Sequence, residues 1–282
     1  MAKTTVKDKT FDEERALYAS EDIAVSNCRF DGPADGESAL KESRDVSVKN
    51  CWFNLRYPFW HVKNLTIEDS EMTDKCRAAL WYTDNAVIRD TKLHGIKALR
   101  ECADIRISDC DIISPEFGWS VMGLNMRDTT VEGEYLFMRS SAIDFKDVTL
   151  KGKYSFQYIS DSVFENSSFD TKDAFWHARN VTVKNCTVRG EYLAWYSENV
   201  TFINCTIIGT QPLCYCTDLK LIDCSMIDAD LAFEKSTVTA SIITPVISIK
   251  NPKDATISVP EVGEVIMDDP NAILHLTYET GI

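Results

Sequence analysis

The sequence predicts an all-β protein, a single-stranded parallel β-helix (β-solenoid) of about twelve coils of about 19 residues. Three observations lead to this prediction. A short motif recurs along the chain, the motif alternates apolar and polar residues with the period of a strand, and no repeat has the length or the periodicity of a helix. The chain has 282 residues, of which 44% are hydrophobic, and this is enough for a sizeable core.

The repeat is clearest in residues 180–188, 199–207 and 218–226, which read NVTVKNCTV, NVTFINCTI and DLKLIDCSM. In every unit an Asn or Asp precedes one residue, here called the anchor, which is mostly Cys, Ser or Thr. Apolar residues stand three before the anchor and two after it. The anchors are Lys9, Cys28, Cys51, Ser70, Thr91, Cys110, Thr129, Val148, Ser167, Cys186, Cys205 and Cys224. Nine of the eleven intervals between them are 19 residues, and the other two are 23 and 21.

Each unit predicts three short strands in a fixed order. A run such as Val-Thr-Val forms the first strand, the Asn or Asp marks a bend, and a second strand follows the anchor. A Gly or Asp often stands four residues after the anchor and marks the next turn, and a run such as residues 192–196 forms the third strand. We expect the Asn and Asp side chains to be buried and to hydrogen-bond from coil to coil as a ladder.

The repeat indicates one domain over residues 1–282, with regular coils over 1–236 and degenerate coils and a cap over 237–282. After Cys224 the next anchor would be Ile243, which follows Ile242 rather than an Asn or Asp. Prolines also punctuate this last segment. Because the open end of a solenoid exposes strand edges and apolar interior, we expect irregular final coils that cover it.

The units V-x-(V/I/F)-x-(N/D)-(C/S/T)-x-apolar over residues 1–226 and the degenerate end at 243–269 resemble the right-handed parallel β-helix proteins of the pectin lyase-like superfamily. More narrowly, the chain is similar to an uncharacterised bacterial family of that superfamily, a domain of unknown function. This resemblance, and not the spacing, implies a right-handed helix. The superfamily includes polysaccharide lyases and galacturonan hydrolases, but this sequence has neither their paired aspartates beside Gly-His-Gly nor their calcium-binding Asp cluster. The resemblance therefore implies the fold and not the reaction.

Aromatic residues concentrate in the third strand. Five of the six tryptophans stand nine residues after the anchor, when the two longer units are counted back from the next anchor, and tyrosines and histidines recur at the tenth position. Neighbouring residues of a strand point to opposite faces, so either register leaves an exposed aromatic ribbon, although the spacing does not tell which position faces solvent. The ribbon residues expected to bind a ligand are Trp60, His61, Trp81, Tyr82, Trp119, Tyr158, Trp176, His177, Trp195 and Tyr196.

Two functions stay open for this ribbon. Flat rings suit the C–H faces of sugars, which indicates carbohydrate binding or polysaccharide processing. Aromatic residues are also enriched at subunit interfaces, which indicates a non-catalytic protein that self-associates through the same face. A third interpretation is that the aromatic side chains are buried in the core and have no binding role.

Charged residues interrupt the aromatic positions in the middle coils. If the protein is an enzyme, we expect a polysaccharide lyase or glycoside hydrolase in which Glu101 and Glu116 act as acid and base. In that reading Arg100 and Arg139 bind a sugar carboxylate or stabilise an oxyanion. The alternative interpretation of these four residues is a ladder of surface charges.

The net charge, the cysteines and the first twenty residues limit the partners, cofactors and cellular location to be expected. The net charge of −14, from 44 acidic and 30 basic residues, repels phosphate backbones and anionic lipid, so we expect neither nucleic acid nor membrane as a partner. An oligosaccharide and a second copy of the chain are the partners that fit. Cys214 and Cys216 have no second pair of ligands, so no metal or other cofactor is expected, and the cysteines are interpreted as small packing residues. The first twenty residues lack the apolar segment of a signal peptide, which predicts a cytoplasmic protein.

Overall fold

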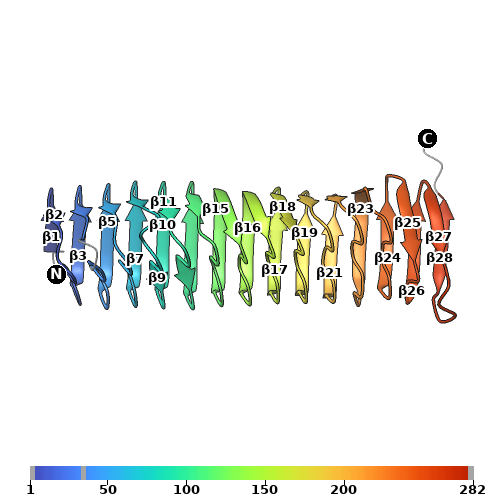
Figure 1. Ribbon diagram of the computed structural model, residues 1–282, viewed down its shortest axis with the longest axis horizontal. Helices are drawn as coiled ribbons and strands as arrows, with labels where there is room; N and C mark the ends of the chain where they lie inside the picture. Colours follow the sequence, from blue (N-terminus) through green and yellow to red (C-terminus); the bar gives the residue numbers. More distant parts are fainter. Residues whose placement is uncertain (1–3, 33–35, 279–282) are drawn as a thin grey trace. The chain divides into compact units, whose positions relative to one another are not determined.

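The structure, a computed structural model, describes residues 4–32 and 36–278 (Figure 1). Over these residues the chain forms strands and turns and no helix. Corresponding strands of successive coils pair in parallel, as Val181 with Val200 and Val183 with Phe202. The predicted fold class is confirmed, with about 14 turns where the repeat predicts about twelve. No helix among the described residues is long and apolar enough to cross a membrane.

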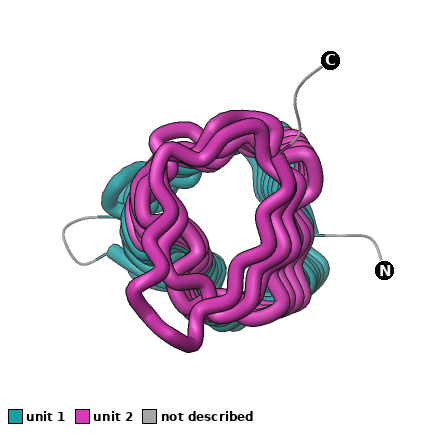
Figure 2. The backbone as a smooth tube through the Cα atoms, turned by 90° about the vertical axis from the view of Figure 1, so that its right-hand side faces the viewer, with its two compact units in different colours: residues 1–144 teal, residues 145–282 magenta. Residues whose placement is uncertain are grey.

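The chain divides into two compact units, Met1–Asp144 and Phe145–Ile282 (Figure 2). In each unit the backbone winds around a central space that apolar side chains fill, with all of Phe30, Phe53, Phe169 and Phe202 fully buried. The expectation of one domain over residues 1–282 stays a prediction.

In the first unit, two strands of each coil flank the Asn or Asp bend. The strands before the bend are β1 (Thr4–Lys7), β3 (Glu21–Ser26), β5 (Arg44–Lys49), β7 (Lys63–Glu68), β10 (Asp84–Arg89), β13 (Ala103–Ser108) and the first part of β15 (Met122–Glu134). The strands after the bend are β2 (Thr10–Phe11), β4 (Arg29–Phe30), β6 (Trp52–Phe53), β8 (Glu71–Met72), β11 (Lys92–His94) and β14 (Asp111–Ile113). Two short strands, β9 (Leu80–Trp81) and β12 (Leu99–Arg100), lie on the third side.

The second unit repeats this plan, and β16 (Ser141–Lys153) leads into it. The strands before the bend are β17 (Ser160–Glu165), β19 (Arg179–Lys184), β21 (Glu198–Ile203), β23 (Leu219–Ile227), β24 (Thr237–Ile242), β26 (Asp254–Val259) and β28 (Leu274–Tyr278). The others are β18 (Ser168–Lys172), β20 (Thr187–Arg189), β22 (Thr206–Ile208), β25 (Val246–Lys250) and β27 (Val262–Ile266). Coils therefore continue through the segment where the sequence motif decays.

The Asn and Asp side chains before the anchors are exposed, so their predicted burial is wrong. The backbone at these residues is left-handed, with φ of 53° at Asn185 and 49° at Asn204, and this conformation turns the side chain away from the core. Asn and Asp tolerate it better than other residues that carry a side chain. The predicted ladder is confirmed, since Asn204 Nδ2 donates to Asn185 Oδ1 across 2.9 Å.

A second left-handed column, six residues before the anchor, escaped the sequence analysis. It includes Asn180 and Asn199, with φ of 54° and 50°, and Asn199 Nδ2 donates to Asn180 Oδ1 across 3.0 Å. The coil therefore has a polar ladder at both ends of its longest strand.

The anchors from Cys28 to Cys224 are buried, and their side chains complete the hydrogen bonding of the bend. Cys51 N donates to Ser70 Oγ across 3.1 Å, and Ser70 Oγ donates to the carbonyl of Glu68 across 2.7 Å. A small side chain with a donor and an acceptor meets this need, which explains the preference for Ser, Thr and Cys. All ten cysteines are free and buried, as packing residues would be.

The third side of the coil is a run of turns, so the predicted third strand is wrong for most coils. In residues 192–196 the φ angle is positive at every second residue, with 58° at Tyr192, 57° at Ala194 and 60° at Tyr196. This alternation replaces the pleat of a strand. From Leu40 to Tyr196 the eighth residue after the anchor points into the core, and the ninth and the tenth both point outward. In the later coils the ninth residues, Cys214 and Phe233, are buried. The rule that neighbouring residues face opposite sides fails here because it holds only for extended backbone.

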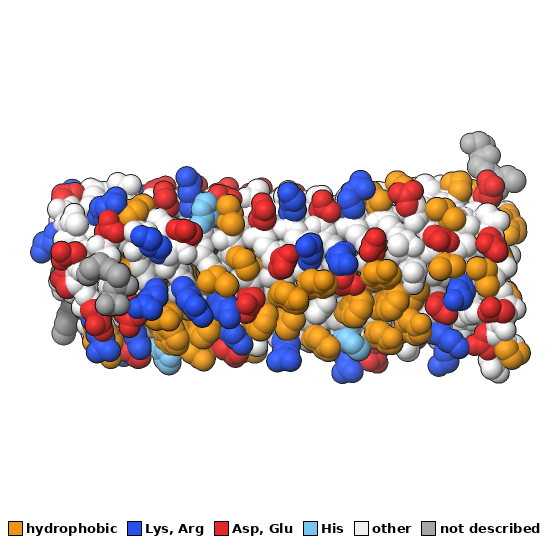
Figure 3. Space-filling view, viewed as in Figure 1, with side chains coloured by type: hydrophobic (Ala, Val, Ile, Leu, Met, Phe, Trp, Pro, Cys, Tyr) orange, Lys and Arg blue, Asp and Glu red, His pale blue; other side chains and the backbone are white. Residues whose placement is uncertain are grey.

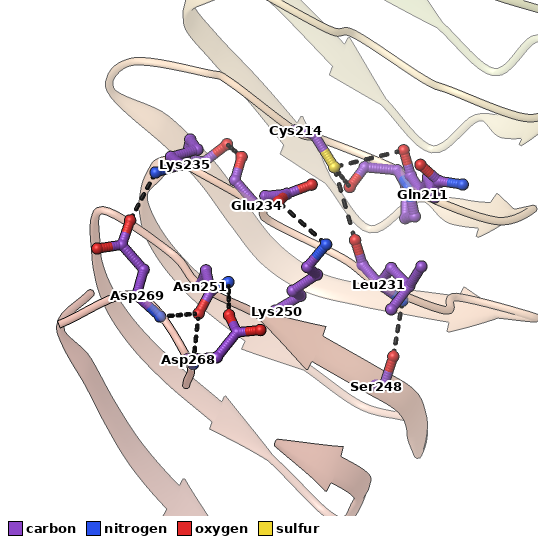
Figure 4. A network of polar contacts seen from close by, with 12 residues as sticks. Gln211, Cys214, Leu231, Glu234, Lys235, Ser248, Lys250, Asn251, Asp268 and Asp269 are labelled. Carbon is purple, nitrogen blue, oxygen red and sulfur yellow. Dashed lines mark hydrogen bonds and ion pairs between the residues drawn. The ribbon is translucent and has the colours of Figure 1, made fainter. Parts of the chain in front are cut away.

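The last coils of the second unit are joined by a polar network (Figure 4). Asn251, which is 6% exposed, accepts hydrogen bonds at Oδ1 from the backbone N–H groups of Asp268 and Asp269, both across 3.0 Å. Lys235 Nζ donates to Asp269 Oδ2 across 2.5 Å. These contacts hold the turn that leads into β28.

Candidate functional site, an aromatic ribbon on the turn side

The outward residues of the turn side form the aromatic ribbon, defined here as the solvent-facing residues among the ninth and tenth after each anchor, counted as above. In the first unit the ribbon includes Trp60, His61, Trp81, Tyr82, Arg100, Glu101, Trp119, Ser120 and Arg139. In the second unit it includes Tyr158, Trp176, His177, Trp195, Tyr196 and Tyr215. Figure 3 shows hydrophobic side chains gathered on the surface of both units, with Lys and Arg side chains beside them in the first.

The ninth residues of the first unit follow one another along the coils in ring–ring and cation–π contact. The rings of Trp60 and Trp81 lie 5.1 Å apart between centroids. The Arg100 guanidinium lies over both Trp81, at 5.1 Å, and Trp119, at 4.8 Å. Lys41 Nζ lies 5.5 Å from the centre of the Trp60 ring. The cations in this column therefore fill positions of the stack by cation–π contact.

The indole N–H groups are fixed to the backbone of the next coil. Trp81 Nε1 donates to the carbonyl of Lys97 across 2.6 Å, and Trp176 Nε1 donates to that of Tyr192 across 2.7 Å. Trp119 and Trp195 make the same bond, in each case to the residue 16 positions further on. These indoles are half-buried and held in one orientation, so what they offer to a ligand is their carbon edges.

The tenth residues of the second unit form a stack of nearly parallel rings. Tyr158 and His177 lie 4.8 Å apart at 6°, and His177 and Tyr196 lie 5.2 Å apart at 11°. Tyr196 and Tyr215 continue the stack at 4.8 Å and 13°. Because each ring covers the face of the next, the surface presents ring edges and phenol hydroxyls. Tyr215 also belongs to this stack, although it is absent from the residues expected to bind a ligand. Its tenth position after the anchor Cys205 is the sequence signal that would have identified it.

The two carboxylates of the middle coils, Glu101 and Glu116, each lie near a basic side chain on the turn side. Lys97 Nζ lies 3.2 Å from Glu116 Oε2, and Arg100 Nε lies 3.9 Å from Glu101 Oε1. Arg139 is exposed in the tenth position of a later coil. The two carboxylates thus each have a basic neighbour, which agrees with the alternative of a surface charge ladder. Their catalytic roles stay a prediction.

The two cavities described here lie away from the aromatic ribbon, and the described residues form no cluster of metal ligands. A cavity of about 520 Å³ in the first unit is lined by the bend residues around Asn50 and Trp52, and one of about 390 Å³ in the second unit is lined by residues around Asp218 and Thr237. Neither is lined by a ribbon residue. Across residues 4–32 and 36–278, no three His, Cys, Asp or Glu side chains are placed to hold a metal ion. Burial raises the pKa of the Cys216 thiol to about 12, which favours the protonated thiol of a packing residue.

Comparison with known proteins identifies a family and a set of similar folds. The family described as "Protein of unknown function (DUF3737)" matches residues 4–277. No curated protein matches the chain in sequence. The match confirms the expectation of a family of unknown function. The chain is also similar in fold to several solved structures.

Three solved structures illustrate that likeness. A double mutant (D339N/E372A) of the tailspike protein of E. coli bacteriophage HK620 is 10% identical with a TM-score of 0.43, over 98% of this chain and 73% of that chain. PfbA, a surface adhesin of Streptococcus pneumoniae, is 8% identical with a TM-score of 0.40, over 93% and 84%. The A-module of the mannuronan C-5 epimerase AlgE4 of Azotobacter vinelandii is 11% identical with a TM-score of 0.36, over 99% and 91%. At these values the likeness concerns the fold alone.

Proposed function

We propose that this chain, which belongs to the family described as "Protein of unknown function (DUF3737)", binds an oligosaccharide along the aromatic ribbon and does not cleave it. The observation that carries the proposal is the exposed row of stacked rings. Tyr158 and Tyr196 are 51% and 47% exposed, although each is packed against His177 on its ring face. Aromatic edges with polar tips suit a ligand that has both C–H surface and hydroxyl groups.

The contacts of the charged residues support binding rather than acid–base catalysis. A general acid and a general base need to face one reacting atom from two sides. Here Glu116 contacts Lys97, and Glu101 contacts Arg100, whose guanidinium is packed between two indoles. The charges therefore extend the hydrogen-bonding capacity of the ribbon.

Self-association through the same ribbon is the second candidate function. The observation that favours it is the coverage of ring faces within each stack, since a sugar that packs on a ring needs a free face. Tyr and Trp edges with fixed geometry are equally typical of protein interfaces.

One pair of measurements separates the two functions. Solution mass is measured by light scattering, and binding is measured on a panel of neutral and acidic glycans by tryptophan fluorescence and calorimetry. The test variant is Tyr158→Ser with Tyr196→Ser, and the control is Val163→Ser, because Val163 is 47% exposed on β17 of the same unit. We expect a monomer that binds at least one glycan, about tenfold weaker binding by the tyrosine variant, and unchanged binding by the control.

Two results would overturn carbohydrate binding. One is a wild-type protein that binds no glycan of the panel. The other is a stable dimer that dissociates in the tyrosine variant and stays intact in Val163→Ser, which would establish self-association instead.

A further inference from the structure

Basic residues gather on one part of the ribbon in a protein that is strongly acidic as a whole. The net charge of the chain is −14. On the turn side of four successive coils, residues 37–42, 56–61, 74–82 and 96–101, six Lys and Arg residues stand against four Asp and Glu residues. Figure 3 shows Lys and Arg side chains close together beside hydrophobic ones in the first unit. A local excess of positive charge attracts anions, and does so most strongly at low salt.

Two of the cations lie against the paired indoles of Trp60 and Trp81. Lys41 lies over the Trp60 ring at 5.5 Å, and Arg100 lies over the Trp81 ring at 5.1 Å, so a cation bounds the indole pair at each end. The Trp81 indole bonds to the backbone carbonyl of Lys97, which places that lysine one coil further on.

Arg77 is exposed on the turn side of the coil that carries Trp81, four residues before it. Its backbone carbonyl accepts a hydrogen bond from Tyr57 N across 3.1 Å, and the Tyr57 ring packs on Trp60 with 4.8 Å between centroids. We call Lys41, Trp60, Arg77, Trp81, Lys97 and Arg100 the basic–aromatic cluster.

The cations of this cluster differ in how well they are neutralised. Lys97 has Glu116 at 3.2 Å, and Arg100 has Glu101 at 3.9 Å. Within residues 4–32 and 36–278, Lys41 and Arg77 have no carboxylate within ion-pair distance, and Arg77 is exposed. The guanidinium of Arg77 is thus open to a planar anion, which arginine binds through two parallel hydrogen bonds.

We propose that the basic–aromatic cluster binds the carboxylate or sulfate groups of an acidic oligosaccharide. This inference rests on the proposed function, and it adds the charge class of the ligand and the part of the ribbon that reads it. The indole edges of Trp60 and Trp81 contact the sugar ring, and Arg77 and Lys41 neutralise its charge.

The test compares glycans of equal length and different charge. The probes are a hexamer of galacturonic acid, a chondroitin sulfate hexasaccharide, maltohexaose as a neutral glycan, and sodium sulfate alone. The variant Arg77→Gln is compared with Arg106→Gln, because Arg106 is also exposed in the first unit but lies on β13, away from the ribbon. Thermal unfolding of each variant shows that it is folded.

We expect at least one acidic hexamer to bind tenfold or more tightly than maltohexaose. Arg77→Gln should weaken that binding about tenfold, Arg106→Gln should change it less than twofold, and added NaCl should weaken it progressively. Equal binding of maltohexaose, with no effect of Arg77→Gln, would overturn the charge class and leave the proposed function standing. Binding of sodium sulfate alone with the affinity of the hexamers would reduce the cluster to a small-anion site. Binding of none of the probes would overturn both proposals.

Discussion

The side chain of Asn185 donates a hydrogen bond from Nδ2 to Oδ1 of Asn166, 19 residues earlier, across 3.2 Å on the solvent-exposed corner of the coil. Both residues have left-handed backbone, with φ of 53° and 50°. The amide ladder therefore forms in water, and the backbone conformation explains why Asn or Asp recurs at this position.

Replacing Asn185 with Leu should destabilise the second unit mainly through its backbone. A left-handed residue with a bulky side chain costs about 1–2 kcal/mol. The variant Asn185→Gly removes the same ladder bonds and accepts the same φ, so we expect it to be about 1 kcal/mol more stable than Asn185→Leu. Urea unfolding curves of the two variants and the wild type check this order. A glycine variant that is no more stable than the leucine variant would assign the effect to the hydrogen bonds.

Removing the hydroxyl of Ser140 should cost more than its size suggests. Val121 N donates to Ser140 Oγ across 2.9 Å, Ser140 Oγ donates to the carbonyl of Gly118 across 2.5 Å, and the residue is 1% exposed. Buried backbone groups left without a partner cost about 1–3 kcal/mol. We expect Ser140→Ala to lower the free energy of unfolding by that amount, and Ser168→Ala, at an exposed serine, to change it by less than about 0.5 kcal/mol. Equal effects of the two substitutions would contradict the role given to Ser140.

Asp173 should lower the stability of the fold as the pH rises, which is the opposite of the usual effect of a carboxyl group. Desolvation raises the pKa of this largely buried carboxyl, Lys172 opposes that shift, and Glu191 adds to it. Because its folded pKa lies above its unfolded pKa, ionisation of Asp173 destabilises the fold as the pH rises through the folded pKa. Asp173→Asn keeps the shape and suits the left-handed backbone, with φ of 52°. We expect this variant to be more stable than the wild type at pH 7 and equally stable at pH 3.

Asp161 is the matched control for that experiment. It has the same φ of 52°, but hydrogen bonds from Asn180 and Ser160 lower the pKa of its carboxyl. Its contribution is present above the unfolded pKa and is lost as the pH falls through the folded pKa. Asp161→Asn should therefore bring no gain in stability at pH 7. A gain there equal to that of Asp173→Asn would show that the burial of Asp173 is not the cause.

Glu101→Gln tests the catalytic interpretation directly. We expect wild-type protein and the variant to leave a panel of uronic-acid and neutral glycans uncleaved, because Glu101 faces Arg100 rather than a second free carboxylate. Product formation is followed by chromatography over long incubations. Turnover by the wild type that Glu101→Gln abolishes while binding persists would establish Glu101 as the acid or base.

The fold class, the repeat of 19 residues and the coil-to-coil contacts of Asn185 and Asn204 followed from the sequence. They could be predicted because stacking places equivalent residues of successive coils beside one another, so a column in the sequence is a row in space. The same logic brought Trp60 next to Trp81, and Tyr158 next to His177.

The tertiary structure alone decided which side of the coil each column faces. Positive φ angles at alternate residues of 192–196 point both Trp195 and Tyr196 outward, and a left-handed bend points Asn185 into water, whereas hydrophobic periodicity assumes an extended strand. The charge partners of Glu101 and Glu116 also depended on the structure, because Arg100 and Lys97 reach them through side-chain conformations that no spacing specifies. Sequence columns determine neighbours along the coils, and the backbone conformation of each turn determines what those neighbours expose.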